Sequence, residues 1–364
     1  MSFSGSYDAG DVSFLLKPLP LQDFVDVADK EYLIQSGQRH YSEMLSPESL
    51  PSERYLQVFV DACAANTARM ASDCLALAAL ICERRKGPGP VTLVSLARAG
   101  TPVGVVLNRL LPAVYGRASR HYSVSIIRDR GIDQVALDHI LAQGHASESI
   151  VFIDGWTGKG VISRELAIAV AGFNASRGTS IDGGLYVLSD LAGTAACAAS
   201  CDDYLIPSSI LNATVSGLIS RSILNEAIGP GDFHGCVYYH QFDAHDQSRS
   251  FADGVTAQAL ALAALPRKAA APSDKQNAAA VSRAYMMAAL QQHGISDANM
   301  IKPGIGEATR VLLRRTPRLL IVRDEQAPEV AHLALLAQEK NVPVMVDRAL
   351  PYHAVSLIRS ALDG

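Results

Sequence analysis

Residues 149–160 read Ser-Ile-Val-Phe-Ile-Asp-Gly-Trp-Thr-Gly-Lys-Gly and join a buried strand to a glycine-rich loop. The apolar run 150–153 predicts a strand, and Asp154 stands at its carboxyl end. A helical run begins directly after the loop, at Val161. In an open α/β sheet, the N–H groups of such a loop and the positive end of the next helix bind anions beyond the strand ends. We therefore expect a phosphate of a small molecule at residues 155–160.

An ordinary strand-to-helix turn is the alternative for this loop, because Gly and Thr also serve turn geometry alone. The phosphate loop of ATPases is excluded, since it needs four residues between its glycines and a Ser or Thr after the Lys. Here only Trp156 and Thr157 separate Gly155 from Gly158, and glycine follows the lysine. The loop therefore predicts a phosphate site of another kind.

The composition is that of a folded chain with a sizeable apolar core. Of the 364 residues, 49% are apolar and 19% are charged, and this length favours two domains. The net charge of −4 gives no overall attraction to nucleic acid or to an anionic membrane. No apolar run reaches the roughly 18 residues of a membrane span, and the N-terminus lacks a secretory signal. The six cysteines are sparse, so we expect reduced thiols and a cytoplasmic protein.

Strands and helices alternate along the chain from residue 91. This alternation predicts an α/β fold with a mostly parallel sheet that is covered on both faces. A long helix at 55–84 precedes it. Further along, we expect a helix at 212–227 and a short strand at 235–240. The strands expected in the sheet are 91–96, 121–127, 150–154, 185–189 and 204–207, with helices at 103–111, 133–143 and 161–173 between the first four.

A linker divides the chain, because residues 265–279 are rich in Pro, Ala and Lys. Residues 1–264 are expected to form the large domain, with an N-terminal extension and helix at 1–90. Residues 280–364 are expected to form a small α/β/α domain. Its expected strands are 319–322 and 342–346, and its expected helices are 280–293, 307–315, 330–340 and 353–362.

The loops that follow the strands carry the candidate side chains. The loop at Arg98 offers a cation and a glycine to a pyrophosphate, and the loop at Arg128 could cover an anionic substrate. Asp154 and Asp190 add acids after two further strands. Several cations and two acids around one pocket suit a sugar with phosphate at one end and pyrophosphate at the other.

A polar cluster at 35–43 places Arg, His, Tyr, Ser and Glu next to a glycine. An active-site flap has this composition, and so has an ordinary solvated loop. Both alternatives stay open at this point. As a lid, the cluster would contact the acceptor through Arg39, His40, Tyr41 and Glu43.

Two of these loops resemble those of a known family. Residues 98–104 and 150–160 are similar to the pyrophosphate and phosphoribosyl-diphosphate loops of type I phosphoribosyltransferases. The similarity is closer to the phosphoribosyltransferase-like proteins of bacterial tellurite-resistance and stress gene clusters, a family often named cysteine protease StiP. It covers most of residues 1–260, and residues from about 281 resemble the Pelota-type RNA-binding domain. The stretches that carry both resemblances include 11–16, 35–43, 121–133, 203–217, 302–307, 319–322 and 341–343.

The resemblance implies glycosyl transfer from phosphoribosyl diphosphate, or a related ribose phosphate, to a nucleobase-like acceptor. It implies Mg²⁺ that arrives with the substrate and is not held in a cage of protein ligands. Asp154 takes the ribose role, but the family's second acid is missing. Either the shortened loop binds a modified donor, or Asp190 substitutes. Catalytic roles fall to Asp154, Arg128 and Asp190, and substrate or phosphate binding to Arg98, Ala99, Gly100, Thr101, Gly155, Trp156, Thr157, Gly158, Lys159, Gly160 and Arg130.

Other functions stay open beside the enzyme. A non-catalytic nucleotide sensor or RNA-binding regulator on the same fold would explain the missing acid. The polar residues of 38–43 and 128–130 favour the enzyme, since a sensor does not need them. A cysteine protease needs a thiol beside a histidine, and a zinc site needs a second Cys or His pair. The candidates, which lack any local signature, are Cys197 or Cys201 with His234 or His240, or Cys236 itself.

A cluster of cations in residues 280–364 suggests what this domain could bind. Lys302 and the arginines around one helix end could meet an RNA backbone, or form a solvated helix face. Alternatively, this domain completes the active site of the first domain. A homodimer is a further expectation, and no membrane partner is expected. The arginines are Arg310, Arg314, Arg315 and Arg318.

Overall fold

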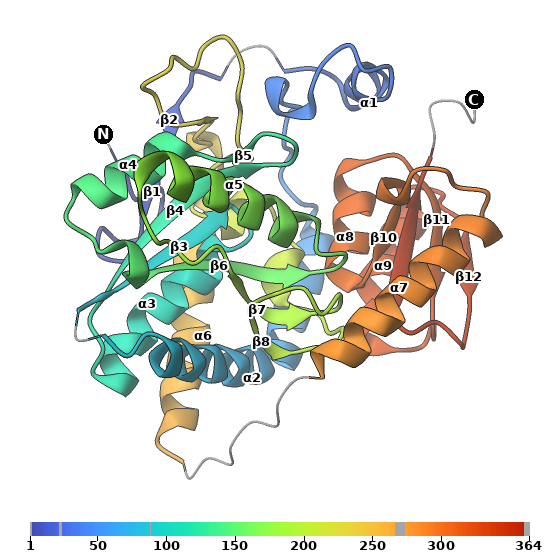
Figure 1. Cartoon of the computed structure of the whole chain (residues 1–364). Coiled ribbons are helices and arrows are strands. Elements are labelled where there is room, and N and C mark those ends of the chain that lie inside the picture. The colour runs from blue at the N-terminus through green and yellow to red at the C-terminus, as the bar shows by residue number, and fades with distance from the viewer. Residues whose placement is uncertain (1, 22–23, 88, 266–273, 360–364) are drawn as a thin grey trace.

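The computed structural model describes residues 2–21, 24–87, 89–265 and 274–359. Its centre is a seven-stranded sheet with helices on both faces, and a four-stranded sheet forms the C-terminal part (Figure 1). All pairings of the large sheet are parallel except that of one short strand. The expected α/β class with a mostly parallel sheet is therefore confirmed. No helix within the described ranges is long and apolar enough to cross a membrane.

Four predicted strands form the middle of the central sheet. Successive residues of each point to opposite faces, so Val151 and Ile153 enter one core while Ile150 and Phe152 enter the other. Apolar side chains in every position therefore fit a strand that is buried on both faces. The strands are β3 (Val91–Ala97), β4 (Ser119–Ile127), β6 (Ile150–Thr157) and β7 (Leu185–Asp190), in the order β4-β3-β6-β7.

Shorter strands extend this sheet at both edges. Strand β1 (Ser13–Leu15) pairs with β4, and β5 (Gly131–Ile132) is the antiparallel exception. Strand β8 (Cys197–Ser200) pairs with β7 at the far edge. Separately, β2 (Lys17–Pro18) and β9 (Gly235–Cys236) form a two-stranded sheet.

Two groups of helices cover the two faces of the central sheet. One face carries α2, α3 and α6, which pack on one another, and the other carries α4 and α5 (Figure 1). A further helix, α1 (Val27–Gln35), lies apart, near the N-terminal loops. The five covering helices are α2 (Glu53–Arg84), α3 (Thr101–Tyr115), α4 (Gln134–Ala142), α5 (Val161–Arg177) and α6 (Ser248–Ala263).

Strand β6 is longer than predicted. The sequence places a loop directly after Asp154, but Trp156 and Thr157 continue the ladder by pairing with Ser189 and Asp190 of β7. The loop that precedes α5 is therefore only residues 158–160.

The segment between β7 and α6 differs most from the prediction. The alanine-rich stretch around Cys197 forms strand β8, and no strand forms at the expected 204–207. The expected helix at 212–227 is reduced to one short turn, Ala213–Val215. Gly217 and Leu218 both have positive φ angles, of 80° and 60°, and this backbone cannot continue a right-handed helix.

The small domain has a mixed sheet in the order β10-β13-β11-β12. Its last strand occupies residues predicted as the helix 353–362, because all five side chains of β13 are buried. A short, continuously apolar run does not distinguish a buried strand from a helix. The elements are α7 (Lys275–Gln292), β10 (Ile301–Pro303), α8 (Ile305–Arg314), β11 (Pro317–Val322), α9 (Ala331–Glu339), β12 (Val344–Val346) and β13 (Ala354–Ile358).

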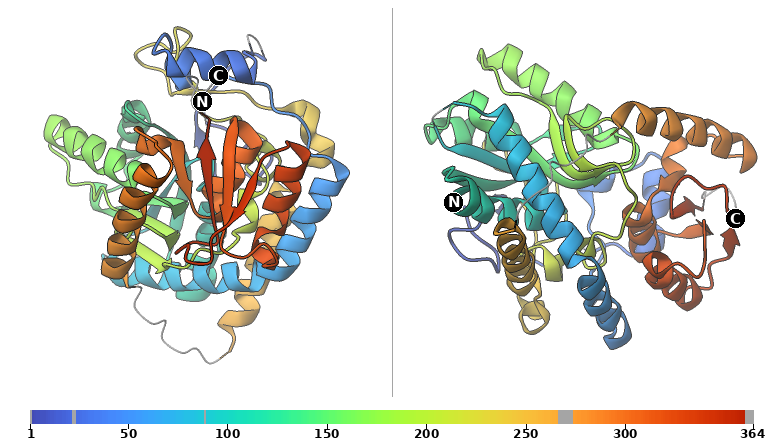
Figure 2. Two further views of the ribbon diagram at one scale, coloured as in Figure 1. Left: turned by 90° about the vertical axis from the view of Figure 1, so that its right-hand side faces the viewer. Right: turned by 90° about the horizontal axis from the view of Figure 1, so that it is seen from below.

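The small domain packs against the carboxyl end of the central sheet (Figures 1 and 2). Helix α7 already begins at Lys275, inside the range expected as linker, and residues 266–273 of that range lie outside the described residues. Asp203 fixes the domains together: its Oδ1 accepts the N–H of Ile305 at 2.9 Å, and its Oδ2 accepts that of His353 at 2.8 Å. One carboxylate thus satisfies the start of α8 and the residue before β13.

Candidate functional site

A cavity of about 310 Å³ lies where the central sheet meets the small domain. It opens at the carboxyl end of β6, and the first turn of α5 forms part of its wall. The small domain forms the opposite wall through α8 and the residues before it. We call this the cationic cavity; its lining is Tyr41, Arg128, Asp154, Trp156, Thr157, Gly158, Lys159, Gly160, Val161, Ile162, Asn299, Lys302, Glu307, Arg310 and Arg315.

The charges of this cavity come from both domains. Arg128 and Lys159 belong to the first domain, and Lys302, Arg310 and Arg315 to the second. The alternative in which the C-terminal domain completes the site therefore agrees with the arrangement. The side chain of Arg314 lies outside the described residues, and Arg318 is absent from the lining and donates to the His293 carbonyl oxygen.

Two carboxylates, Asp154 and Glu307, face these cations. Glu307 lies 3.2 Å from Arg310 and 3.9 Å from Lys302. Burial alone would raise the pKa of Glu307, but the two cations outweigh burial and lower it. Burial raises the pKa of Asp154 to about 6, with Arg310 opposing the shift. The cationic cavity therefore holds more positive than negative charge and suits a polyanionic ligand.

Lys159 reaches across the domain boundary. Its Nζ donates a hydrogen bond of 2.6 Å to the carbonyl oxygen of Ala298. Burial, with repulsion from Lys302, lowers the pKa of Lys159 to about 7. A ligand phosphate beside this amine would favour its charged form.

Trp156, the single tryptophan of the chain, forms one of the contacts between the domains. The Arg310 guanidinium lies 4.4 Å from the centroid of its ring, within the range of a cation–π interaction. Gly306 packs on the same ring so closely that a Cβ atom there would stand 2.5 Å from a ring carbon. The predicted phosphate-loop residue Trp156 thus lines the cavity and also positions α8.

The loop residues around Trp156 have distinct roles. Gly160 has a φ of 69° and donates its N–H to Thr157 Oγ1 at 3.1 Å, which shapes the turn into α5. Gly158 approaches Pro303 of the small domain: a Cβ there would lie 3.0 Å from the Pro303 carbonyl oxygen. Gly155 is the only residue of the expected 155–160 loop that the cavity lining lacks.

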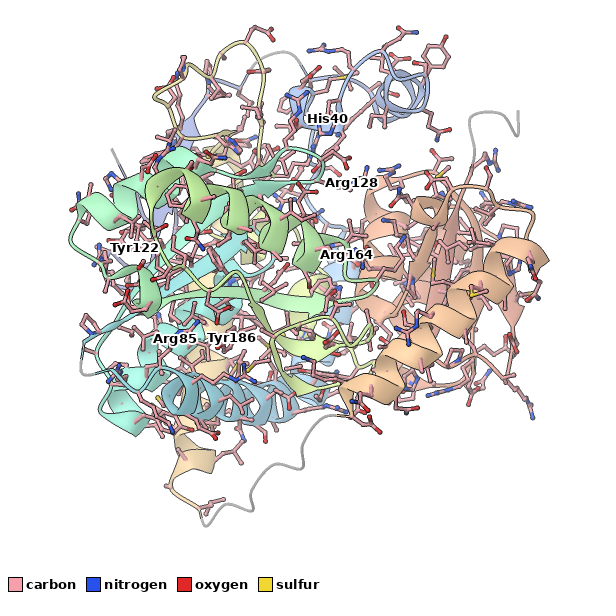
Figure 3. The ribbon with its side chains drawn as sticks, in the orientation of Figure 1. His40, Arg85, Tyr122, Arg128, Arg164 and Tyr186 are labelled. Carbon is pink, nitrogen blue, oxygen red and sulfur yellow. The ribbon has the colours of Figure 1, made fainter. Side chains whose placement is uncertain are left out.

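The 39–43 segment lies beside the loop at Arg128. The N–H of Arg128 donates to Tyr41 Oη at 2.8 Å, and Arg130 pairs with Glu43 at 2.5 Å. His40 bonds Ser42 through Nδ1 at 2.8 Å, and Figure 3 shows it above Arg128 on the side of the small domain. The two polar segments thus meet, as a flap over the site would require. Tyr41 and Arg128 line the cationic cavity, whereas Arg39 and Arg130 pair with Glu43.

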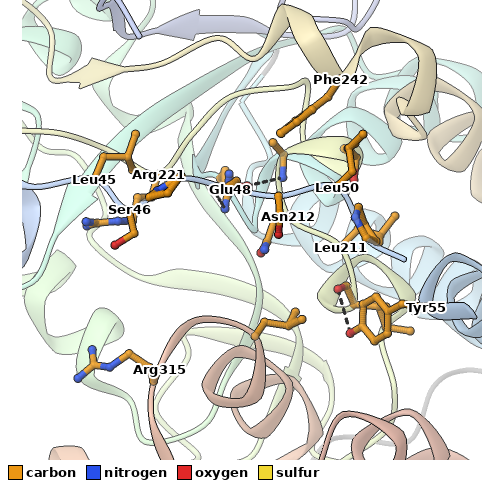
Figure 4. A pocket seen from close by; sticks show the side chains of 18 of the residues that line it. Leu45, Ser46, Glu48, Leu50, Tyr55, Leu211, Asn212, Arg221, Phe242 and Arg315 are labelled. Carbon is orange, nitrogen blue, oxygen red and sulfur yellow. Dashed lines mark hydrogen bonds and ion pairs between the residues drawn. The ribbon is translucent and has the colours of Figure 1, made fainter. Parts of the chain in front are cut away.

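A second cavity, of about 290 Å³, adjoins the first and shares Tyr41 and Arg315 with it. We call it the adjoining cavity. Its walls combine apolar and aromatic side chains with buried charges (Figure 4). The charged lining residues are Lys30, Glu48, Arg98, Arg221 and Arg315, and the apolar or aromatic ones include Ile34, Tyr41, Leu50, Tyr55, Leu211 and Phe242.

The predicted pyrophosphate loop at 98–101 does not reach the cationic cavity. Arg98 lines the adjoining cavity, where it pairs with Glu48 at 2.5 Å and donates to the Ile219 carbonyl at 2.6 Å. The N–H groups of Gly100 and Thr101 are used within the turn, by the carbonyls of Leu96 and Arg98. Because the two terminal nitrogens of Arg98 and the N–H groups of Gly100 and Thr101 already have partners, these groups form no free cradle for a pyrophosphate beside Ala99. Gly100 instead lets the turn approach β6, since a Cβ there would lie 2.5 Å from the Ile153 carbonyl oxygen.

Asp190 is likewise placed away from both cavities. Its carboxylate accepts the N–H groups of Ala192 at 3.2 Å, Thr194 at 3.1 Å and Ala195 at 2.8 Å. The side chain is fully buried and holds the turn after β7. The structure therefore gives Asp190 a structural role in place of the expected catalytic one.

We expect Asp190→Ala to destabilise the fold by about 2–4 kcal/mol, because three N–H groups, two of them in buried residues, lose their acceptor. Urea denaturation measures this loss. Asp138→Ala, which removes an acid paired on the surface with Arg177, is the matched control and should cost less than about 1 kcal/mol. Equal losses for the two variants would contradict the structural role of Asp190.

Comparison with known proteins places this architecture in a family. Residues 5–256 match the family described as tellurite-like stress resistance cysteine protease StiP. The chain belongs to the StiP family. Residues 280–360 match the Pelota RNA-binding domain. A protein of Acinetobacter baylyi, named "Cysteine protease StiP", is 41% identical over 374 residues, covering 100% of this chain and 96% of its own length.

The StiP family name directs attention to the six cysteines. None of them lines the cationic or the adjoining cavity, and all six are free thiols. Burial raises the pKa of Cys197, and it raises that of Cys63 and Cys236 to about 12. Nucleophilic thiols need a lowered pKa and an adjacent base. His234, one of the expected partners, instead bonds Ser125 Oγ through Nδ1 at 2.7 Å.

The cationic cavity of this StiP-family chain offers few side chains that could hold a metal ion. No group of three or more His, Cys, Asp or Glu side chains that could hold a metal occurs among the described residues. The cationic cavity offers two carboxylates among five cations. Oxygen donors are what Mg²⁺ prefers, and phosphate oxygens would have to supply most of them.

Several lining residues were not singled out as site residues from the sequence. Glu307, Glu48 and Arg221 lie far apart in the chain, and neither Glu48 nor Arg221 adjoins a glycine-rich loop. Lys302 and Arg310 were noticed, but as an RNA-binding surface. The closest sequence signal is the Pro-Gly-Ile-Gly-Glu run at 303–307, whose glycines allow the close approach to the first domain.

Proposed function

We propose that the chain transfers a phosphoribosyl group from phosphoribosyl diphosphate, or a related ribose phosphate, to a nucleobase-like acceptor. The observation that carries this proposal is the cationic cavity at the carboxyl end of β6. It combines the first turn of α5, five cations and Asp154. A phosphorylated sugar diphosphate has the complementary charge distribution, with anionic groups at both ends of a ring.

Each part of the cavity has a role in this reaction. Residues 157–160 and the start of α5 bind the 5′-phosphate, and Arg128, Lys302 and Arg310 bind the diphosphate. Asp154 stands beside the ribose, where its carboxylate stabilises the positive charge that develops on the ring. Mg²⁺ on the phosphate oxygens would neutralise further charge on the leaving group. Tyr41 and its segment exclude water, which competes with the acceptor.

The reaction needs no reactant other than the donor and the acceptor. The bond from ribose C1 to the diphosphate oxygen breaks, and the diphosphate leaves with the electron pair. A ring nitrogen of the acceptor forms the new bond to C1 with its lone pair. Where that nitrogen carries a hydrogen, the proton leaves with the diphosphate.

Proteolysis, the activity in the name of the Acinetobacter baylyi relative, lacks a matching geometry among the described side chains. The raised thiol pKa values and the absence of cysteines from both cavity linings argue against a thiolate nucleophile. A regulator that binds RNA through residues 280–360 is the second candidate, favoured by the Pelota match. The position of Lys302, Arg310 and Arg315 on the cavity wall favours a small ligand instead.

Calorimetric titration of phosphoribosyl diphosphate with Mg²⁺ tests the proposal. We expect micromolar binding that Lys159→Ala weakens by about tenfold or more, since one charged hydrogen bond to phosphate is lost. Lys340→Ala removes a lysine that lies in neither cavity lining and should leave the affinity unchanged. A folded wild type that does not bind the donor would refute the proposed function.

The affinity for the donor should depend on pH through Lys159. Its pKa of about 7 reflects burial first, then repulsion from Lys302 and Arg128, with Glu307 and Asp297 opposing. The amine is charged below pH 7 and loses its proton above it, so we expect about tenfold weaker binding at pH 8 than at pH 6. Lys159→Arg stays charged throughout this range. The donor itself titrates in this range, so the measured quantity is the difference between the two proteins; parallel pH profiles would contradict the role of Lys159.

A further inference from the structure

The adjoining cavity contains a half-buried cation, Arg221, that forms no ion pair with a carboxylate of the described chain. Arg221 donates to the carbonyl oxygen of Met44 and lies 5.6 Å from the centroid of the Tyr41 ring. No ion pair joins it to an acid within the described ranges. Burial lowers the pKa of Arg221 to about 10, so its charge is disfavoured by its surroundings yet present at neutral pH. An unpaired charge that is partly removed from water is destabilising, and a ligand that supplies the counter-ion offsets this cost.

The one acid in this lining is Glu48, and both of its carboxylate oxygens already have partners other than Arg221. Its Oε1 pairs with Arg98 at 2.5 Å, and its Oε2 accepts the N–H of Ala213 at 3.3 Å. Arg98 in turn gives a second N–H to Ile219. The opposite charges of Arg98 and Glu48 therefore offset each other, and Glu48 does not form an ion pair with Arg221. Figure 4 shows Arg221 beside Glu48, with Arg315 of the small domain across the space from them.

The remaining walls favour a flat, partly apolar molecule. Tyr41, Tyr55 and Phe242 provide aromatic faces, and Leu50 and Leu211 provide apolar surface. The volume of about 290 Å³ is at the lower end of the range for small-molecule sites. A single-ring heterocycle fits this space and composition.

The adjoining cavity also borders the place where the donor would react. Tyr41 and Arg315 belong to both linings. The Tyr41 ring has the Arg128 guanidinium of the cationic cavity and the Arg221 guanidinium of the adjoining cavity each at 5.6 Å from its centroid. An acceptor on the Arg221 side would therefore meet a donor on the Arg128 side.

We propose that the adjoining cavity is the acceptor site and selects a planar nitrogen heterocycle that carries a carboxylate, which Arg221 binds. The planar guanidinium fork matches a carboxylate in two parallel hydrogen bonds, and the aromatic walls hold the ring. This inference rests on the proposed phosphoribosyl transfer for the role of acceptor. In the transfer, the heterocycle nitrogen gives its lone pair to ribose C1 as the diphosphate departs with its own pair, and the carboxylate is unchanged.

Calorimetry with chemically matched pairs tests the inference: nicotinate against nicotinamide, and orotate against uracil. In the wild type we expect each carboxylate to bind at least tenfold more tightly than its neutral partner. Arg221→Gln should remove this preference, and Arg221→Lys should retain part of it. Arg249→Gln, on the exposed surface beside Asp8, is the matched control and should retain it fully. Thermal unfolding establishes that the Arg221 variants fold, and the wild-type comparison does not depend on them.

A wild type that does not distinguish the members of either pair would overturn the inference, and so would a preference that survives Arg221→Gln. Titration of phosphoribosyl diphosphate into the same samples separates this failure from failure of the proposed function. Donor binding without carboxylate preference refutes the acceptor class alone. Carboxylate preference without donor binding supports the Arg221 site and refutes the donor.

Discussion

Replacing Asp154 by asparagine is expected to slow pyrophosphate release from phosphoribosyl diphosphate by about 100- to 1000-fold, the usual cost of losing one preorganised electrostatic group. The substitution keeps the shape of the side chain but removes its negative charge. The ribose ring becomes positive only as its bond to the diphosphate breaks, so this charge acts on the transition state and not on the bound donor. The effect should therefore appear in kcat.

The affinity of Asp154→Asn for the donor, in contrast to its rate, should not fall. Asp154 is one of two carboxylates that face five cations in the cationic cavity. Because the donor is a polyanion, removing a carboxylate from its site is expected to leave binding unchanged or to tighten it slightly. Loss of activity without loss of donor binding distinguishes a catalytic acid from one that merely maintains the fold.

Asp138→Asn provides the matched control, since this acid pairs with Arg177 on the surface of the central domain. Its rate and affinity should equal those of the wild type. Pyrophosphate release is measured with saturating donor, Mg²⁺ and the heterocycles used for the acceptor test. If Asp154→Asn released pyrophosphate as fast as Asp138→Asn, the catalytic assignment of Asp154 would be wrong.

The core of the fold was predictable because local pattern and tertiary environment agree there. Apolar runs bounded by loops and followed by helical periods identified β3, β4, β6 and β7. The prediction failed where the environment decides the outcome. Residues 354–358 are apolar enough for a buried helix or a buried strand, and only the neighbours β10 and β11 select the strand.

Only the part of the site that lies in one continuous stretch of sequence could be predicted. The loop after β6 identified Asp154, Lys159 and Gly160 because strand, acid, glycine and helix follow one another in the sequence. Glu307 and Arg310 reach the same cavity through packing between domains, which no local pattern encodes. Asp190 shows the converse: it stands at a strand end like a catalytic acid, but the three N–H groups that it accepts come from the turn that follows.

Gly306→Val is expected to weaken donor binding by about 100-fold or more while the central domain stays folded. A Cβ at this position would stand 2.5 Å from the Trp156 ring, so α8 must move away from β6. Arg310, which lies 4.4 Å from the ring centroid, and Lys302 then leave the cationic cavity. Loss of two charge-assisted contacts to phosphate, each of about 1.5–3 kcal/mol, accounts for an effect of this size.

The same substitution at Gly172 is the matched control. Gly172 is also helical, within α5, and a Cβ there meets no atom within 4 Å. The intrinsic cost of valine in a helix is therefore similar in both variants, and only Gly306→Val disturbs the contact between domains. Because Trp156 is the only tryptophan, its fluorescence reports directly on that contact.

We expect a shift of the tryptophan emission to longer wavelength in Gly306→Val, as water reaches the ring, and no shift in Gly172→Val. Donor affinity and emission should change together, since both depend on where α8 lies. A variant with shifted emission and wild-type affinity would mean that the donor is bound by the first domain alone. The cations of the small domain would then serve another ligand, and RNA, the ligand named in the Pelota match, would be the first to test.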